Sequence, residues 1–273
     1  MKISIITPTK NSEKYILETL QSIHGQNYPD LEHIIVDGCS TDRTVEIIEK
    51  FIKDKGCANI SLIVKPDKNM YEAINTGLSQ ITGDIFAYLN SDDNYYKGTF
   101  DKIEGCFKSH PGIDMIYGNC EYIDEEGKTL FWSNNPAFNF NRLIRAGTSW
   151  IQQPGTFYRK SLLKKTGYFN TSYRYASDYD YLLRVGKASR VLGIRDTLVK
   201  FRFHSGSISM SCTDVMFSER DRIREPYMRG WPVLLNKLQA LFDYSVVYAL
   251  LIRPENFRYM VKKIAGLLKI TSR

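Results

Sequence analysis

Two adjacent carboxylates, Asp92 and Asp93, follow the apolar run of residues 85–90. That run has the length and apolarity of a buried strand, and the polar residues 90–94 are typical of the turn that ends one. In open α/β sheets, ligands bind at the carboxyl ends of strands, where two carboxylates supply oxygen ligands for a hard cation that neutralises a diphosphate. The alternative is a solvated acidic turn that caps the next helix.

A third carboxylate, Asp37, ends a second apolar run at residues 31–37. A carboxylate fixed at a strand end can accept the imide N–H of a pyrimidine, and such polar recognition rejects bases that lack this donor. The alternative role for Asp37 is an acidic residue at the N-terminus of the following helix. Either role requires a turn at this strand end, and residues 38–44 have the composition of one.

The elements that must position these carboxylates alternate between strand and helix four times within the first ninety residues. This alternation predicts an α/β fold with a mostly parallel, right-handed sheet. The hydrophobic periodicity places strands at residues 2–9, 31–37, 60–65 and 85–90, and helices at 12–24, 44–55 and 71–82. Ser40 or Thr41 is the expected N-cap of the second helix.

The chain has 273 residues, of which 43% are hydrophobic, and this suits one large domain with a helical appendage. Its five cysteines are scattered and odd in number, which indicates neither a disulfide framework nor a zinc site and fits a reducing cytosol. The short apolar run at residues 3–6 predicts neither a signal peptide nor an N-terminal membrane anchor.

Four segments of the first half resemble the nucleotide-sugar-binding half of family 2 glycosyltransferases. They are residues 5–11 (IITPTKN), 36–44 (VDGCSTDRT), 65–71 (KPDKNMY) and 89–93 (LNSDD). The resemblance extends to about residue 210. It implies a single GT-A-type, Rossmann-like domain over residues 1–210, with a nucleotide-sugar-binding half at 1–97 and an acceptor-binding half at 98–210. It also implies inverting transfer from a nucleotide diphosphate sugar, with UDP as the expected nucleotide and Mn²⁺ or Mg²⁺ as the cofactor.

The same resemblance assigns donor-binding residues by position. These are Thr7, Pro8, Thr9, Asp37, Asp67, Lys68, Asn75 and Asp92. Many relatives carry Arg where this chain has Ile74, so one contact to the donor is absent or comes from elsewhere, with Lys68 as the nearest candidate. The metal motif often begins with Asp where this chain has Asn90, which leaves Asp93 as the expected direct ligand and Asp92 as a ribose or outer-sphere partner.

The acceptor half carries the expected catalytic base. Residues 152–170 resemble the family's acceptor-side segment, in which a strand enters a helix that Gly167 ends. Residues 173–184 (YRYASDYDYLLR) resemble its Glu-Asp motif, with Ser177 in the usual Glu position and Asp178 as the base. An acidic residue favoured by the helix dipole is the alternative for Asp178, and Asp180 is its close competitor.

His204, in residues 201–209 (FRFHSGSIS), matches a His that relatives often carry near the diphosphate and metal. A lone His is otherwise more often structural. Between the two halves we expect a helix at residues 99–109 and strands at 114–118, 120–123 and 129–132. Nearby aromatic side chains could stack on sugars or simply pack: Trp132, Phe138, Phe140 and Trp150.

The basic charge is concentrated at the C-terminus, since residues 220–273 hold 11 Lys and Arg against four Asp and Glu. Residues 211–273 are predicted to form a helical, basic extension. The apolar stretch 233–252 is interrupted by polar residues, which argues against a spanning helix. The segment either lies on an anionic membrane or packs on protein.

The sequence therefore predicts a transferase of cell-surface polysaccharide biosynthesis that acts on a glycan or lipid-linked glycan. We expect it in the cytoplasm or peripheral on the inner face of the membrane. Transfer to a polyprenyl phosphate is the alternative acceptor reaction. A nucleotidyltransferase is disfavoured because residues 7–11 contain no glycine, and a nucleic-acid binder because no groove-reading motif is present.

Overall fold

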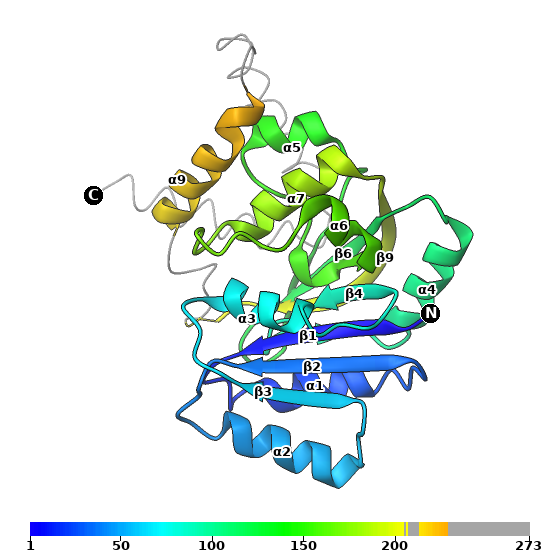
Figure 1. Cartoon of the computed structure of the whole chain (residues 1–273), viewed down its shortest axis with the longest axis vertical. Helices are drawn as coiled ribbons and strands as arrows, with labels where there is room; N and C mark the ends of the chain where they lie inside the picture. The colour runs from blue at the N-terminus through cyan, green and yellow to red at the C-terminus, as the bar shows by residue number, and fades with distance from the viewer. Residues whose placement is uncertain (205, 207–212, 229–273) are drawn as a thin grey trace.

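The fold is a mixed nine-stranded sheet with helices on both faces, seen in the computed structural model of Figure 1, which describes residues 1–204, 206 and 213–228. The strand order is β3-β2-β1-β4-β8-β6-β9-β5, and β7 pairs with β6. The strands are β1 (Ile3–Thr9), β2 (Leu31–Asp37), β3 (Ile60–Val64), β4 (Ile85–Tyr88), β5 (Asn94–Tyr95), β6 (Met115–Ile123), β7 (Thr129–Trp132), β8 (Thr156–Arg159) and β9 (Val191–Arg202).

The first half is the parallel, alternating unit that the sequence predicts. Strands β3, β2, β1 and β4 pair in parallel and in register, so their carboxyl ends meet at one edge of the sheet. Helices α1 (Ile16–His24) and α2 (Thr44–Lys55) pack against one face through a small apolar cluster, and α3 (Met70–Leu78) packs on the other. The predicted α/β class with a mostly parallel sheet is confirmed.

The second half adds antiparallel pairs and several helices. Strand β8 joins β4 to β6, and the long strand β9 runs parallel to β6. The helices here are α4 (Thr99–Ser109), α5 (Phe140–Ala146), α6 (Leu163–Thr166), α7 (Ser177–Ala188) and α9 (Thr213–Arg224). Three short 3₁₀ turns accompany them, at Gln153–Gly155, Lys160–Leu162 and Glu225–Tyr227.

Three local predictions are wrong. Helix α1 begins at Ile16 because the residues before it form a turn on the Ser12 carbonyl. Neither Ser40 nor Thr41 caps α2, since the Asp42 carboxylate accepts the Thr44 N–H at 3.0 Å. The two strands expected at 114–123 are one strand, β6, whose register against β9 shifts near Asn119.

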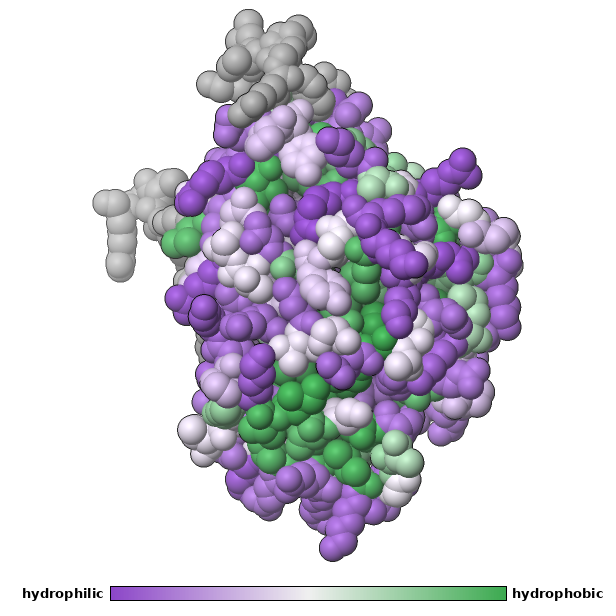
Figure 2. All heavy atoms as spheres, in the orientation of Figure 1, coloured by the Kyte–Doolittle hydropathy of each residue, from purple (hydrophilic) through white to green (hydrophobic). Residues whose placement is uncertain are grey.

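The surface is mostly hydrophilic, with an apolar area over the β1–β3 end of the sheet, where β3 is only partly buried (Figure 2). Within the described ranges, no helix combines the length and apolarity needed to cross a bilayer. Helix α9 lies beyond the expected domain boundary at residue 210, yet it packs on α7. The rest of the expected C-terminal extension, residues 229–273, lies outside the described residues.

Candidate active site

The acidic turn after β4 contains one buried and one accessible carboxylate. Asp93 is 1% exposed, and its Oδ1 accepts the backbone N–H of Arg202 at 2.9 Å. Its Oδ2 is buried without a hydrogen-bond partner among the described residues. Burial, together with the negative charge of Asp92, raises the pKa of Asp93 well above its ordinary value. Burial therefore disfavours the charged form of Asp93, and Asp92 is the accessible carboxylate of the turn.

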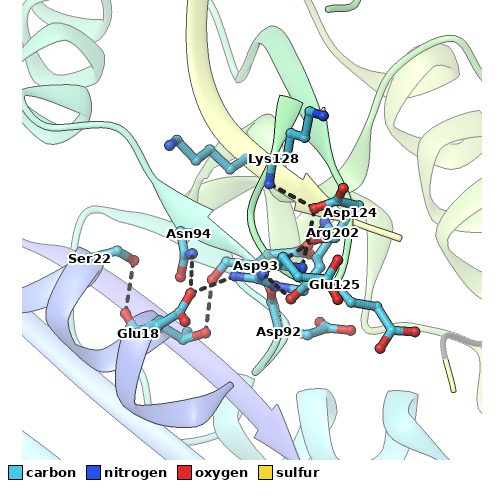
Figure 3. Close-up of polar contacts among 12 residues, drawn as sticks. Glu18, Ser22, Asp92, Asp93, Asn94, Asp124, Glu125, Lys128 and Arg202 are labelled. Carbon is cyan, nitrogen blue, oxygen red and sulfur yellow. Dashed lines mark hydrogen bonds and ion pairs between the residues drawn. The ribbon is translucent and has the colours of Figure 1, made fainter. Parts of the chain in front are cut away.

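Arg202, near the end of β9, fixes this turn in place. Its Nε donates to the Asp92 carbonyl at 3.0 Å, and its Nη2 forms an ion pair of 2.5 Å with Glu18 of α1. Its guanidinium also lies 4.7 Å from the ring centroid of Tyr15. In Figure 3 Asp93 turns into this network, whereas the Asp92 side chain extends away from it. Arg202 therefore holds the backbone while Asp92 projects outward.

His204 contacts Asp92, not Asp93. Its Nε2 lies 2.8 Å from Asp92 Oδ2, and its ring stacks at a tilt on Tyr15, with centroids 5.0 Å apart. The Asp92 and His204 side chains are 24% and 17% exposed, so a ligand can reach both. His204 thus contacts Asp92, while the Asp93 carboxylate is turned inward onto the Arg202 backbone, and the metal role expected for Asp93 stays a prediction.

These residues fit a divalent cation that is also bound by substrate. A carboxylate oxygen and an imidazole nitrogen are ligands that Mn²⁺ accepts, and Mg²⁺ commonly keeps one or two carboxylates, several waters and substrate phosphates. Among the described residues no group of three or more His, Cys, Asp or Glu side chains could hold a metal. Donor oxygens and water would therefore complete the coordination.

Asp37 lies at the matching end of β2 and is fully buried. Its carboxylate accepts the Ser40 N–H at 2.7 Å and the Ser40 hydroxyl at 2.5 Å, which closes the β2–α2 turn. Each carboxylate oxygen retains a second lone pair for a ligand. At Gly38, a Cβ would lie 2.4 Å from the Asp67 carboxylate, so a larger residue there would displace the Asp67 side chain. Burial raises the pKa of Asp67 in this position.

Of the expected donor-binding residues on β1, Thr7 is hydrogen-bonded inside the molecule, whereas Pro8 and Thr9 are the last two residues of the strand. The Thr7 hydroxyl is bonded to His33 at 2.9 Å inside the molecule, which in turn contacts His24 of α1. Thr9 is the last residue of β1, and its buried hydroxyl has no hydrogen-bond partner in the described structure. Thr9, with Pro8 beside it, is therefore better placed than Thr7 to meet a ligand at the strand end.

Asn75 and Lys68 do not converge on this edge. The Asn75 side chain donates to the Phe169 carbonyl at 2.8 Å and accepts the Phe169 N–H at 3.0 Å. It joins α3 to the acceptor half, and the donor-binding role expected for it stays a prediction. Lys68 is exposed, and its backbone N–H is bonded to Glu72, which leaves its side chain in solvent near the loop.

Asp178 lies in the first turn of α7 and lines an interior pocket together with Tyr88, Gln153 and Phe169. The two hydrogen bonds that its carboxylate accepts within the described chain both reach Oδ1, from the Tyr179 N–H at 2.8 Å and the Tyr71 hydroxyl at 3.4 Å. Burial raises the pKa of Asp178, and the Arg220 cation opposes the shift. Neither of these two hydrogen bonds uses Oδ2.

Asp178 and Asp93 both lie close enough to the Tyr88 side chain, at the end of β4, for their charges to act on it. Burial is the main cause of the raised pKa of Tyr88, and the charges of both Asp178 and Asp93 add to it. Asp180, the competitor of Asp178, points elsewhere, because it is 16% exposed and forms an ion pair with Arg184 at 2.6 Å. Of these two carboxylates, Asp178 lines the pocket with Tyr88, and its role as the base stays a prediction.

The aromatic residues considered as sugar platforms pack inside the molecule. Trp150 is 1% exposed, and Phe138 and Phe140 are partly buried against the main core cluster. Trp132 is half-buried on β7. Sequence reasoning missed residues that act across long separations, namely Tyr71, Arg202, Glu219 and Arg220. Two of them lay within segments that the sequence singled out, Tyr71 in residues 65–71 and Arg202 in residues 201–209.

Comparisons with known proteins identify the family of this chain. The model of Glycosyl transferase family 2 matches residues 4–172. A PGL/p-HBAD biosynthesis glycosyltransferase of Mycobacterium bovis is 27% identical over 87% of this chain and 94% of its own. The poly(ribitol-phosphate) beta-N-acetylglucosaminyltransferase TarS of Staphylococcus aureus is 29% identical over 67% of this chain and 32% of its own.

Solved structures show the same fold. A crystal structure of residues 1–349 of Staphylococcus aureus TarS in complex with UDP has a TM-score of 0.66 and 25% identity, over 89% of this chain and 70% of that one. A mannosyltransferase from Pyrobaculum calidifontis in complex with GDP-Man and Mn²⁺ has a TM-score of 0.64 at 17% identity, over 99% of this chain and 79% of that one. With a GT-A-type sheet whose strand ends carry the acidic turn, this chain belongs to glycosyl transferase family 2.

Proposed function

We propose that this glycosyltransferase transfers a sugar from a UDP-sugar to a hydroxyl of a cell-surface glycan, with inversion at the anomeric carbon. The observation that carries the proposal is Asp178, a carboxylate that lines a pocket together with Tyr88, the last residue of β4. The UDP complex of TarS supports the choice of nucleotide. Asp37, Thr9 and Pro8 would bind the nucleoside at the ends of β1 and β2.

In the proposed reaction, Asp178 accepts the proton of the acceptor hydroxyl as its oxygen attacks the anomeric carbon. The bond between that carbon and the diphosphate oxygen breaks, and UDP leaves with the electron pair. Asp92 and His204 would hold Mn²⁺ or Mg²⁺, which when bound neutralises the charge that develops on the diphosphate. The contacts of Arg202 with the buried Asp93 and with the Asp92 carbonyl keep the turn in shape behind them.

The acceptor and the membrane are further parts of this proposal. A glycan or lipid-linked glycan hydroxyl needs a general base, whereas a polyprenyl phosphate is already ionised and needs none. The placement of Asp178 therefore favours the hydroxyl acceptor. We also propose that the basic residues after position 228 attract the protein to an anionic membrane surface, which is tested by vesicle sedimentation of the full chain at low and high salt.

The donor and metal part is tested by thermal unfolding with UDP. We expect UDP to raise the melting temperature more with Mn²⁺ than with EDTA, and a ligand at 100 times its Kd stabilises by about 2.7 kcal/mol. Asp92→Ala and His204→Ala should remove the difference. Asp196→Ala, which breaks only an exposed ion pair with Lys102, is the matched control. Equal shifts with and without metal would contradict the cation site.

A further inference from the structure

Glu219 of helix α9 has a buried carboxylate that contacts the loop before α7, the helix that carries Asp178. Glu219 is 8% exposed, although it belongs to the segment that follows the family match. Its Oε1 accepts the backbone N–H of Arg174 at 2.9 Å, and its Oε2 accepts those of Tyr175 and Ala176, also at 2.9 Å. Hydrogen bonds from three consecutive amides to one carboxylate are charge-assisted and therefore strong.

The three amides lie directly before α7. Ala176 is the N-cap of this helix and is fully buried, but its side chain cannot cap the helix. Glu219 accepts the N–H groups of the N-cap residue and of the two residues before it, and it fixes the backbone two residues before Asp178. A misplacement of about 1 Å at a reacting group can cost about 10²-fold in rate, so this fixation bears directly on the base.

Helix α9 is itself anchored by residues that follow Glu219. Arg220 donates to the Thr148 hydroxyl at 3.1 Å, and Arg224 donates to the Arg145 carbonyl at 3.0 Å. Ile223 is 4% exposed and belongs to the main core cluster. The Glu219 carboxylate therefore sits on a helix that is tied to the α5 region by separate contacts, and it can act as a fixed support.

We infer that Glu219 is a positioning residue for the transfer reaction, which holds the 174–176 backbone so that Asp178 meets the acceptor hydroxyl. This inference rests on the proposed role of Asp178. It also makes α9 a part of the catalytic unit, although the family match ends at residue 172. A purely structural role for Glu219 would lower stability but leave the turnover of folded enzyme unchanged.

The test compares Glu219→Gln with Asp221→Asn in the full chain. Glutamine keeps the shape but replaces one acceptor oxygen by an NH₂ group that faces backbone donors. Asp221 has the same charge on the same helix, but it is exposed and pairs with Arg224. Below the melting temperature of each variant, we expect Glu219→Gln to lower kcat by up to about 10²-fold, with the donor KM and the UDP-induced melting shift unchanged. Asp221→Asn should retain the wild-type kcat.

Glu219→Asp covers the case in which the glutamine variant does not fold. It keeps the charge and shortens the reach, so a reduced kcat at unchanged donor KM supports the inference, and a wild-type kcat overturns it. Asp178→Asn, measured in parallel, shows whether a failure concerns only the positioning role of Glu219 or the proposed function itself. If Asp178→Asn is inactive while Glu219→Gln retains kcat, only the positioning role fails; if Asp178→Asn is active, the proposed function itself fails.

Discussion

Replacing Asp178 by Asn tests the chemistry at the pocket with the smallest change in shape. The substitution keeps an oxygen that can accept the Tyr179 N–H, but it removes the proton acceptor at Oδ2. General-base catalysis contributes about 10²–10⁴-fold. At 1.36 kcal/mol for each tenfold change in rate, the barrier should rise by about 3 to 5 kcal/mol.

The same substitution should not destabilise the protein. Burial raises the pKa of Asp178, so the folded state binds this proton more tightly than the unfolded state does. The stability contributed by the site is therefore present at low pH and is lost as the pH rises through the folded-state pKa, and at neutral pH the ionised carboxylate is a cost. A neutral Asn should leave the melting temperature equal or higher.

The assay measures UDP release in the presence of acceptor and the melting temperature of each variant. Asp180→Asn is the matched control, because it neutralises the carboxylate two residues along and breaks the ion pair with Arg184. We expect Asp180→Asn to lower the melting temperature more than it lowers the rate of UDP release. A near wild-type rate for Asp178→Asn, or a loss of rate that simply follows unfolding, would refute the assignment of Asp178 as the base.

Three further perturbations test the electrostatics around the site. Arg220→Met should move the acid limb of the kcat/KM profile to higher pH, because the Arg220 cation lowers the pKa of Asp178; an unmoved limb would count against this. Burial lowers the pKa of His24 to about 4, so the melting temperature of the wild type should fall as the pH drops from about 6.5 to about 4, and less so in His24→Gln. Arg202→Met should cost about 1.5–3 kcal/mol in urea unfolding and weaken UDP binding with Mg²⁺, since it removes the charged hydrogen bond to the Asp92 carbonyl; unchanged values would contradict its role.

Hydrophobic periodicity was sufficient for much of the fold. Strand β2, helix α4 and strand β7 have the predicted bounds, because apolar runs ended by turn residues specify them locally. Strand β9 was not predicted, since its mixed sequence becomes a strand only by pairing with β6 and β5. Non-local pairing also joined the two segments expected at residues 114–123 into one strand.

The site was predicted in part for a similar reason. A pattern of adjacent acids shows that charge collects at a strand end, but it cannot show which side chain turns inward. The contact between Arg202 and Asp93 decides this, and it joins residues 109 positions apart. Glu219 was invisible to sequence reasoning because its partners are backbone amides more than forty positions away, which leave no side-chain signature.

Proton NMR of donor hydrolysis tests the central claim most directly. An α-linked UDP-hexose or UDP-N-acetylhexosamine would be incubated with the full chain and Mg²⁺, and the anomer released first would be recorded before mutarotation. Single displacement predicts that the β-anomer appears first, that EDTA suppresses it, and that Asp178→Asn abolishes it. Release of the α-anomer first would contradict the single displacement at the pocket of Asp178.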